Sequence, residues 1–196
     1  VNTNMVENWF DSDFVTIILY HRNLIMSKIV DFYIGSGTDH KLRSWAEIVS
    51  KNDDWLESEH DFIQWLFPLC EASEFSEFAP ILTDEDILIL KMEPLFKKRM
   101  ATSFFVMMSF FGLEPKMIDG ELKIKKDKSF FEERSKVWLS PNNHNYLRIT
   151  RILKCLCLFG MNKYAEAFVE NLLDLKKEFD SYISVNNVEY WMEAIE

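Results

Sequence analysis

A row of basic side chains in the second half of the chain is the arrangement best placed to do chemistry. The stretch 141–160 reads PNNHNYLRITRILKCLCLFG, and as a helix it would turn about 100° per residue. His144, Arg148 and Arg151 then stack one per turn, and Lys154 extends the row. The chemistry indicated is anion binding, because guanidinium groups form paired hydrogen bonds with phosphate and carboxylate oxygens.

The residues around this row support an anion site but leave a structural alternative open. No Asp or Glu occurs between Ser140 and Tyr164, although the chain as a whole is acidic. Asn142 and Asn143 lie where the helix should begin, and free backbone N–H groups at a helix N-terminus attract anions. In the alternative interpretation, the basic residues pair with the acidic first half of the chain inside the fold.

A second group of candidate residues lies in the sequence WLESEHDFIQWLFP. His60 and Gln64 are four residues apart at the edge of its apolar side, with Asp61 and Trp65 beside them. His60 could form half of an acid–base pair with Asp61, or help the basic row to hold an anion. Adjacent residues on a helix point about 100° apart, so we expect His60 and Asp61 not to face each other. The structural alternative is a buried, hydrogen-bonded histidine in an aromatic core.

The charge distribution separates general from local anion binding. The 196 residues include 22 Lys and Arg against 32 Asp and Glu, a formal net charge of −10. Residues 1–90 hold 5 basic and 17 acidic residues, whereas residues 91–196 hold 17 and 15. This balance argues against general binding to nucleic acid or to anionic membranes. A local basic patch in the second half could still bind one anion.

Composition predicts an all-α fold. Hydrophobic residues make up 48% of the chain, with 17 Phe and 6 Trp, which is enough for a substantial core. Only 5 Gly and 5 Pro occur, too few for a turn-rich β-sandwich or a glycine-dependent nucleotide-binding fold. We therefore expect residues 1–196 to form a single compact bundle of about seven or eight helices. One short β-hairpin near residues 116–126 is also expected, because Asp119-Gly120 favours a tight turn.

Apolar spacing and helix-ending Gly and Pro residues give the expected helix boundaries. The predicted helices cover residues 12–34, 38–50, 53–67, 83–111 with a break near Pro94, 128–139, 146–159, 162–179 and 188–195. The predicted core face of helix 146–159 consists of Ile149, Ile152, Leu153, Leu156 and Phe159.

Other sequence features indicate an intracellular, cytoplasmic protein. Cysteines number three and lie in apolar surroundings, which is typical of reduced thiols and too few for a zinc site. The N-terminus lacks the basic region of a secretory signal, and the longest apolar runs fall short of the ~18 residues that span a membrane. No nucleotide-binding, metalloprotease or hydrolase motif is present. We therefore expect no transmembrane segment, no metal and no cofactor, and favour a protein that is not an enzyme.

Two long motifs resemble the signatures of the opioid growth factor receptor conserved domain. Residues 60–69, HDFIQWLFPL, followed by 79–83, APILT, are similar to the family signature HDYIQWLFP...AP.LT, with Phe62 replacing the commoner Tyr. Residues 143–156, NHNYLRITRILKCL, resemble the second signature, NHNxLRITRILKxL. The two motifs occur in the family's order.

Shorter matches extend the resemblance along the chain. Residues 108–112, MSFFG, resemble the family segment M-x-F-[YF]-G, and Phe32-Tyr33 with Gly35 fits its FY-x-G beginning. The resemblance covers about residues 30–175, which leaves residues 180–196 as a C-terminal helical appendage. It implies a domain whose vertebrate members act as receptors for an enkephalin-type growth factor, associate with the nucleus and restrain proliferation.

The sequence and this resemblance together predict a non-enzymatic binding module for a peptide or small anionic ligand, with a protein partner as a further option. If the chain behaves like the vertebrate members, its location is nuclear or perinuclear. The candidate ligand-binding residues are His60, Asp61, Gln64, Trp65, Asn143, His144, Arg148 and Arg151. The alternative function is an enzyme that acts on a phosphoester or nucleotide through His60, His144, Arg148 and Arg151.

Overall fold

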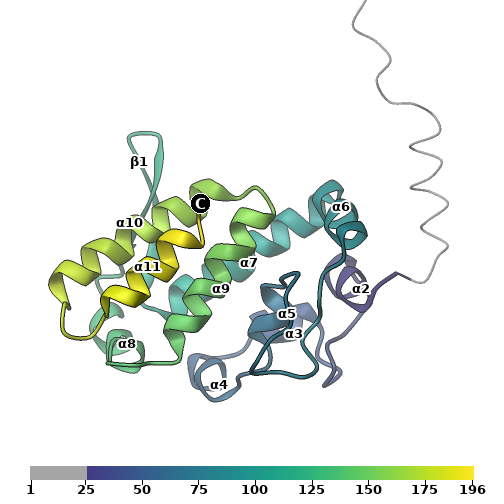
Figure 1. Ribbon diagram of the computed structural model, residues 1–196, viewed down its shortest axis with the longest axis horizontal. Coiled ribbons are helices and arrows are strands. Elements are labelled where there is room, and N and C mark those ends of the chain that lie inside the picture. The colour runs from purple at the N-terminus through teal and green to yellow at the C-terminus, as the bar shows by residue number, and fades with distance from the viewer. Residues whose placement is uncertain (1–25) are drawn as a thin grey trace, which may run out of the picture.

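The structure is a computed structural model that describes residues 26–196 (Figure 1). Its helices are α2 (Lys28–Ile34), α3 (Trp45–Val49), α4 (Asp53–Ser58), α5 (Ile63–Leu66), α6 (Asp84–Met92), α7 (Pro94–Phe110), α8 (Phe131–Trp138), α9 (Asn145–Leu158), α10 (Asn162–Glu178) and α11 (Val185–Glu193). Strands β1 (Leu113–Ile118) and β2 (Glu121–Lys126) form one antiparallel hairpin. The predicted all-α class with one hairpin is confirmed.

The structure has ten helices within residues 26–196, compared with the seven or eight that we predicted. Part of the difference comes from the first half, where short helices alternate with loops. α2 begins after Ser27, whose side chain accepts a hydrogen bond from the Val30 backbone, and ends at Gly35. The earlier part of the predicted helix 12–34, residues 12–25, lies outside the described residues.

The predicted helix over residues 38–50 is shorter in the structure, where only α3 is helical. Thr38 forms an antiparallel bridge with Ser44, and Asp39 holds the loop between them. Its carboxylate accepts hydrogen bonds from the backbone N–H groups of Lys41 and Arg43 at 2.9 and 2.8 Å. A side chain that satisfies backbone donors in this way competes with helix formation.

The predicted continuous helix over residues 53–67 was wrong, because α4 ends at Ser58 and α5 begins only at Ile63. No Gly or Pro lies between Glu59 and Phe62, so neither of the usual helix-ending residues accounts for the end of α4. The carbonyl oxygens of Leu56 and Glu59 instead accept hydrogen bonds from Arg148 of α9. A tertiary contact therefore accompanies the break between the two helices.

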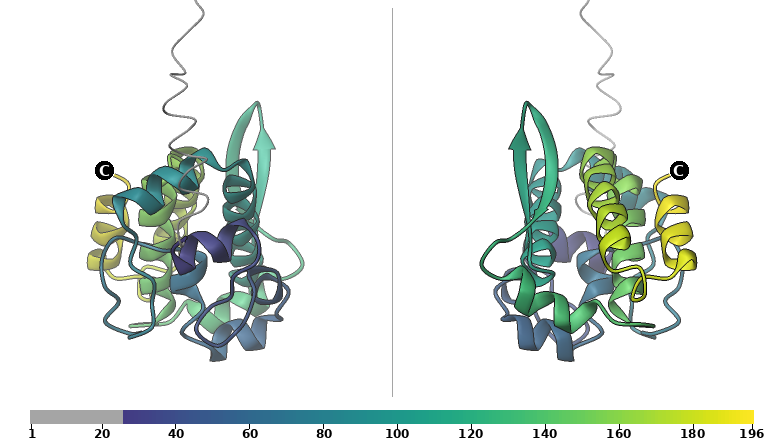
Figure 2. Two further views of the ribbon diagram at one scale, coloured as in Figure 1. Left: turned by 90° about the vertical axis from the view of Figure 1, so that its right-hand side faces the viewer. Right: turned by 90° about the vertical axis from the view of Figure 1, so that its left-hand side faces the viewer.

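The middle of the chain follows the predicted pattern closely. Thr83 and Asp86 form a capping box at the start of α6, and Pro94 is the first residue of α7, where its missing N–H costs nothing. α7 ends before Gly112, and the hairpin turns at Asp119-Gly120, both at positive φ. Both views in Figure 2 show this hairpin projecting beyond the helices.

The core lies around α9. α10 and α11 lie on one side of this helix, and α4 and α5 lie on the other (Figure 1). Every residue of its predicted core face is buried. α7 contributes a row of large apolar side chains to the same core, although Phe105 remains 42% exposed. Trp191 of α11 is buried and donates a hydrogen bond to the Tyr146 carbonyl of α9. α11 is therefore packed onto the helix that carries the basic row.

Candidate functional site

Arg148 joins α9 to the stretch 55–68 that holds the second group of candidate residues, although the two lie far apart in the sequence. Its Nη1 donates to the Leu56 carbonyl at 2.8 Å, and its Nη2 donates to the Glu59 carbonyl at 2.7 Å. A further bond runs from Nη1 to Oδ1 of Asn145 at 3.1 Å. Carbonyl groups at a helix C-terminus carry partial negative charge, so the guanidinium caps α4. These bonds commit Arg148 to holding the fold.

The pKa of Arg148 reflects this buried position. Only 5% of the residue is exposed, and burial lowers the pKa of its guanidinium to about 10, with the nearby Glu57 carboxylate opposing the shift. The rings of Phe62 and Phe110 lie beneath it, with centroids 5.4 and 6.0 Å from Cζ. The group still carries its charge at neutral pH, balanced by carbonyl dipoles and aromatic faces.

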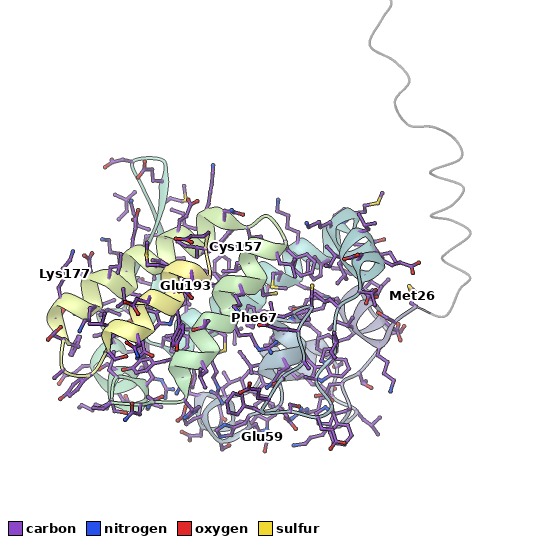
Figure 3. The ribbon with its side chains drawn as sticks, in the orientation of Figure 1. Met26, Glu59, Phe67, Cys157, Lys177 and Glu193 are labelled. Carbon is purple, nitrogen blue, oxygen red and sulfur yellow. The ribbon has the colours of Figure 1, made fainter. Side chains whose placement is uncertain are left out.

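Arg151 lies one turn further along α9, and its guanidinium makes fewer hydrogen bonds than that of Arg148. Its Nη1 donates to the Phe67 carbonyl at 3.0 Å, and burial lowers the pKa of the guanidinium. Glu59 and Phe67, both labelled in Figure 3, lie on either side of α5, and the carbonyl of each accepts a hydrogen bond from α9. The two arginines thus fasten the segment 59–67 at both ends.

A pocket of about 340 Å³ lies between this segment, α9 and the loop after α5. It is lined by His60, Ile63, Gln64, Leu69, Glu71, Ala72, Ser73, Glu74, Phe75, His144, Leu147, Arg148, Thr150, Arg151 and Lys154. Five of the eight predicted residues are in this lining, and so is Lys154, which completes the basic row. The structure therefore brings most of the two predicted groups to one place.

Gln64 gives the pocket wall hydrogen-bonding capacity that the described residues leave unused. The residue is 3% exposed, and its Oε1 is buried without a hydrogen-bond partner. Its amide nitrogen makes only a long contact of 3.5 Å to Ser73 Oγ. A buried polar atom without a partner is energetically unfavourable, so a bound group that donates to Oε1 would be stabilised there.

His60 and His144 both line the pocket, and their rings are in direct contact. Their ring centroids are 4.8 Å apart with the planes at 43°. Nε2 of His144 is buried without a hydrogen bond, at 3.6 Å from the nearer carboxylate oxygen of Glu57. Burial lowers the pKa of His144, the charge of Arg148 and His60 lower it further, and Glu57 opposes them. His144 is accordingly neutral at pH 7, when it can donate to or accept from a ligand.

Three predicted site residues lie outside this pocket lining. Asp61 is turned toward the 38–44 loop, where it contacts Nε2 of His40 at 3.1 Å, Nζ of Lys41 at 2.7 Å and Nη2 of Arg43 at 2.8 Å. Burial would raise the pKa of Asp61, but hydrogen bonds from Lys41 and Arg43 outweigh it and hold the pKa below its usual value. Asp61 therefore belongs to a separate ion-pair network, and the expected lack of contact between it and His60 fits this arrangement.

Trp65 and Asn143 support the fold around the pocket. Trp65 is buried against Phe32, with ring centroids 5.4 Å apart. Asn143 donates to the Val137 carbonyl at 3.0 Å and accepts from the Asn145 backbone at 2.9 Å, which fastens the start of α9. Both residues help to position the pocket walls.

Sequence reasoning missed the loop that closes the pocket and the polar residues behind it. The wall formed by Glu71, Ser73 and Phe75 comes from a segment between the predicted helices, where no helical or strand periodicity marks it. The dense mixture of acids and aromatics there was the only available signal. Asn145, with no exposed surface, donates to Glu57 at 3.1 Å and so links α9 to α4. Its place inside the NHN motif could have identified it.

Two further features bear on the class of site. Within residues 26–196, no group of three or more His, Cys, Asp or Glu side chains is arranged to hold a metal ion. Among the helices that the structure describes, none combines the length and the apolar character needed to cross a membrane.

Comparison with known proteins identifies the family. The opioid growth factor receptor (OGFr) conserved region matches residues 30–196, and the chain belongs to that family. No solved structure matches the chain significantly.

Curated relatives include opioid growth factor receptor-like protein 1 from Mus musculus, 32% identical over 79% of this chain and 30% of its own length. The protein of that name from Xenopus tropicalis is 33% identical over 76% of this chain and 27% of its own. The opioid growth factor receptor of Mus musculus is 31% identical over 68% of this chain and 20% of its own. The match therefore spans less than a third of these relatives.

Proposed function

We propose that this domain binds the carboxylate end of a peptide in the pocket between α9 and the segment that holds α5. The carrying observation is that His60, Gln64, His144 and Arg151, from two distant motifs, line one cavity. Arg151 and the two imidazoles suit a carboxylate, and the unpartnered Oε1 of Gln64 suits a backbone N–H donor. A peptide C-terminus offers both groups, whereas a fully ionised phosphate offers acceptors alone.

The pocket rim supports a peptide over an inorganic anion. Phe75 and Leu147 line the cavity and remain 69% and 53% exposed, and Ile63 and Leu69 supply buried apolar walls. Binding sites of this kind combine apolar walls with a few polar groups that fix orientation. Some relatives are named as receptors for an opioid growth factor, and a growth factor is a polypeptide. That name agrees with a peptide as the ligand class.

The finer expectations from the sequence belong to the same proposal. The domain acts inside the cell, since its three cysteines are free thiols. Residues 30–175 and the helical segment 180–196 function as one domain, which the burial of Trp191 against α9 supports. A protein partner would present the peptide as its own C-terminus.

The test is a thermal-shift measurement with three probes: a mixed tripeptide library with free C-termini, the same library with amidated C-termini, and inorganic phosphate. We expect the free-carboxylate library to raise the melting temperature and the amidated library to leave it unchanged. Arg151→Gln should abolish the shift, while Lys163→Gln, an exposed cation on α10 outside the pocket lining, should retain it.

Three outcomes would contradict the proposal. Equal shifts with the free and amidated libraries would exclude carboxylate recognition. A shift with phosphate alone would assign the pocket to an inorganic anion or phosphoester. Phosphate release from a nucleotide that disappears in His144→Ala would establish the enzymatic alternative in place of a binding module.

A further inference from the structure

The loop 70–80 forms one wall of the pocket and is closed at its base. Leu69 pairs with Ile81 in a parallel bridge, and the Leu82 N–H donates to the Leu69 carbonyl at 2.9 Å. A surface loop whose ends meet in this way is an Ω-loop, a compact type of loop that frequently carries function. The wall is thus a loop closed at its base, with further side-chain contacts to α5, α9 and His40 along its length.

This loop brings an anion of its own to the basic row. Oε1 of Glu71 lies 2.9 Å from Nζ of Lys154, and both residues line the pocket. Their side chains are 59% and 42% exposed, and ion pairs with that exposure contribute little to stability because water competes for both charges. The pair is consequently able to open when a stronger anion arrives.

The other cations of the row are less available than Lys154. Arg148 is fully engaged by backbone carbonyls, and Arg151 donates to the Phe67 carbonyl. Lys154 is therefore the member of the row that pairs with another exposed side chain, that of Glu71. A ligand that needs a second positive charge beside Arg151 must compete with Glu71 for it.

We propose that Glu71 is an internal competitor, whose carboxylate occupies Lys154 until the anionic group of the ligand replaces it. This inference rests on the proposed function, because it concerns the same pocket. Exchange removes the ion pair between the loop and α9, while the Gln64–Ser73 contact of 3.5 Å, the Phe78–His40 stack and the bridge at the base of the loop remain. The pocket is then in a restrained state before binding and an open one after it.

Isothermal titration with the free-carboxylate tripeptide library tests the inference. Glu71→Gln removes the competing charge and should tighten binding by about three- to fivefold, the upper part of the range expected for one exposed ion pair. Glu77→Gln removes the same charge from the same loop outside the pocket lining, and should leave affinity within about twofold of wild type. In a Lys154→Gln background, Glu71→Gln should give no more than the effect of Glu77→Gln.

The outcomes separate this inference from the proposed function. Tighter binding by Glu71→Gln that depends on Lys154, including binding detected in that variant alone, supports internal competition. Binding by wild type that Glu71→Gln leaves unchanged or weakens overturns the competitor and leaves the peptide site in place. Tightening that persists in the Lys154→Gln background assigns the effect to net charge and also overturns it. Folded proteins that bind in no variant overturn the proposed function, and the competitor falls with it.

Discussion

Nη1 of Arg148 lies 2.8 Å from the carbonyl oxygen of Leu56, a residue 92 positions earlier in the chain. This one bond places the basic row of α9 against the end of α4. The same guanidinium was a candidate for ligand binding in the sequence. In the structure, its hydrogen bonds position the pocket wall, and its buried positive charge lies at the pocket lining.

Arg148→Ala should lower the free energy of unfolding substantially, by about 3 kcal/mol, because it leaves buried carbonyl groups without donors. Arg151→Ala is the matched variant one turn along, and should cost about 1 kcal/mol since it removes one backbone bond. Urea unfolding followed by circular dichroism measures both. Equal losses would show that Arg148 is not the principal link between α9 and α4.

The glycines that end α7 and α9 give a second matched pair. Gly112 and Gly160 both have positive φ, at 72° and 69°. A Cβ at Gly112 would lie 2.8 Å from Cα of Phe131, whereas one at Gly160 meets nothing within 4 Å.

Gly160→Ala should therefore cost only the conformational penalty, about 1 kcal/mol. Gly112→Ala should cost about 3 kcal/mol or more, because the start of α8 must move as well. Thermal unfolding of the two variants, monitored side by side, tests the close approach of α7 and α8. Similar melting temperatures would contradict it.

His144 should make stability depend on pH in the acidic direction. Its pKa in the folded protein is held below the usual value of 6.5, mainly by burial. The unfolded chain therefore binds more protons as the pH falls through 6.5, and the folded state loses stability there. Above that pH, the contribution is fully present.

We expect the loss of stability between pH 7.5 and 5.5 to be smaller in His144→Gln than in wild type. Urea unfolding at several pH values gives the difference, and the carboxylates that also titrate cancel between the two proteins. An NMR titration of the His144 ring provides an independent reading. A ring that titrates above 6.5 in the ligand-free protein would refute the assignment.

Phe78 should anchor the far end of the loop 70–80. Its ring stacks on His40 with centroids 5.2 Å apart and planes at 12°, while most of the side chain remains exposed. Phe78→Ala should increase proteolytic cleavage within the loop with little change in the melting temperature.

Phe75→Ala is the control, because Phe75 lies in the same loop, is 69% exposed and lines the pocket instead. It should leave cleavage close to the wild-type rate. Mass spectrometry of the limited digest identifies the cut sites. Faster cleavage in Phe75→Ala than in Phe78→Ala would show that Phe75, and not Phe78, anchors the loop.

Sequence reasoning was strongest where a signal is local and periodic. The core face of α9 follows from one apolar residue per turn, and its five members are all buried. The turn at Asp119-Gly120 and the end of α7 at Gly112 follow from residues that tolerate positive φ. These features depend on a few neighbouring residues, so the sequence alone determines them.

The site was predicted only in part, because its geometry depends on contacts across long separations. No Gly or Pro marks the break at Glu59, so the sequence predicted one continuous helix there. The direction of the Asp61 side chain in the structure could not be derived from that helix. The role of Arg148 depends on carbonyl groups that no side-chain pattern reveals. Lys154 was recognised as part of the row, but its partner Glu71 comes from a loop with no periodicity.

The joining of Leu69 to Ile81 has an evolutionary consequence. Because the ends of the loop 70–80 are fixed to each other, its length can change at small entropic cost, about 0.6 kcal/mol for each doubling. Insertions or substitutions there would reshape the rim and the charge of the pocket while the helices stay in register. A change in this one strip of chain can thus alter the pocket of this protein while the scaffold held by the two arginines stays constant.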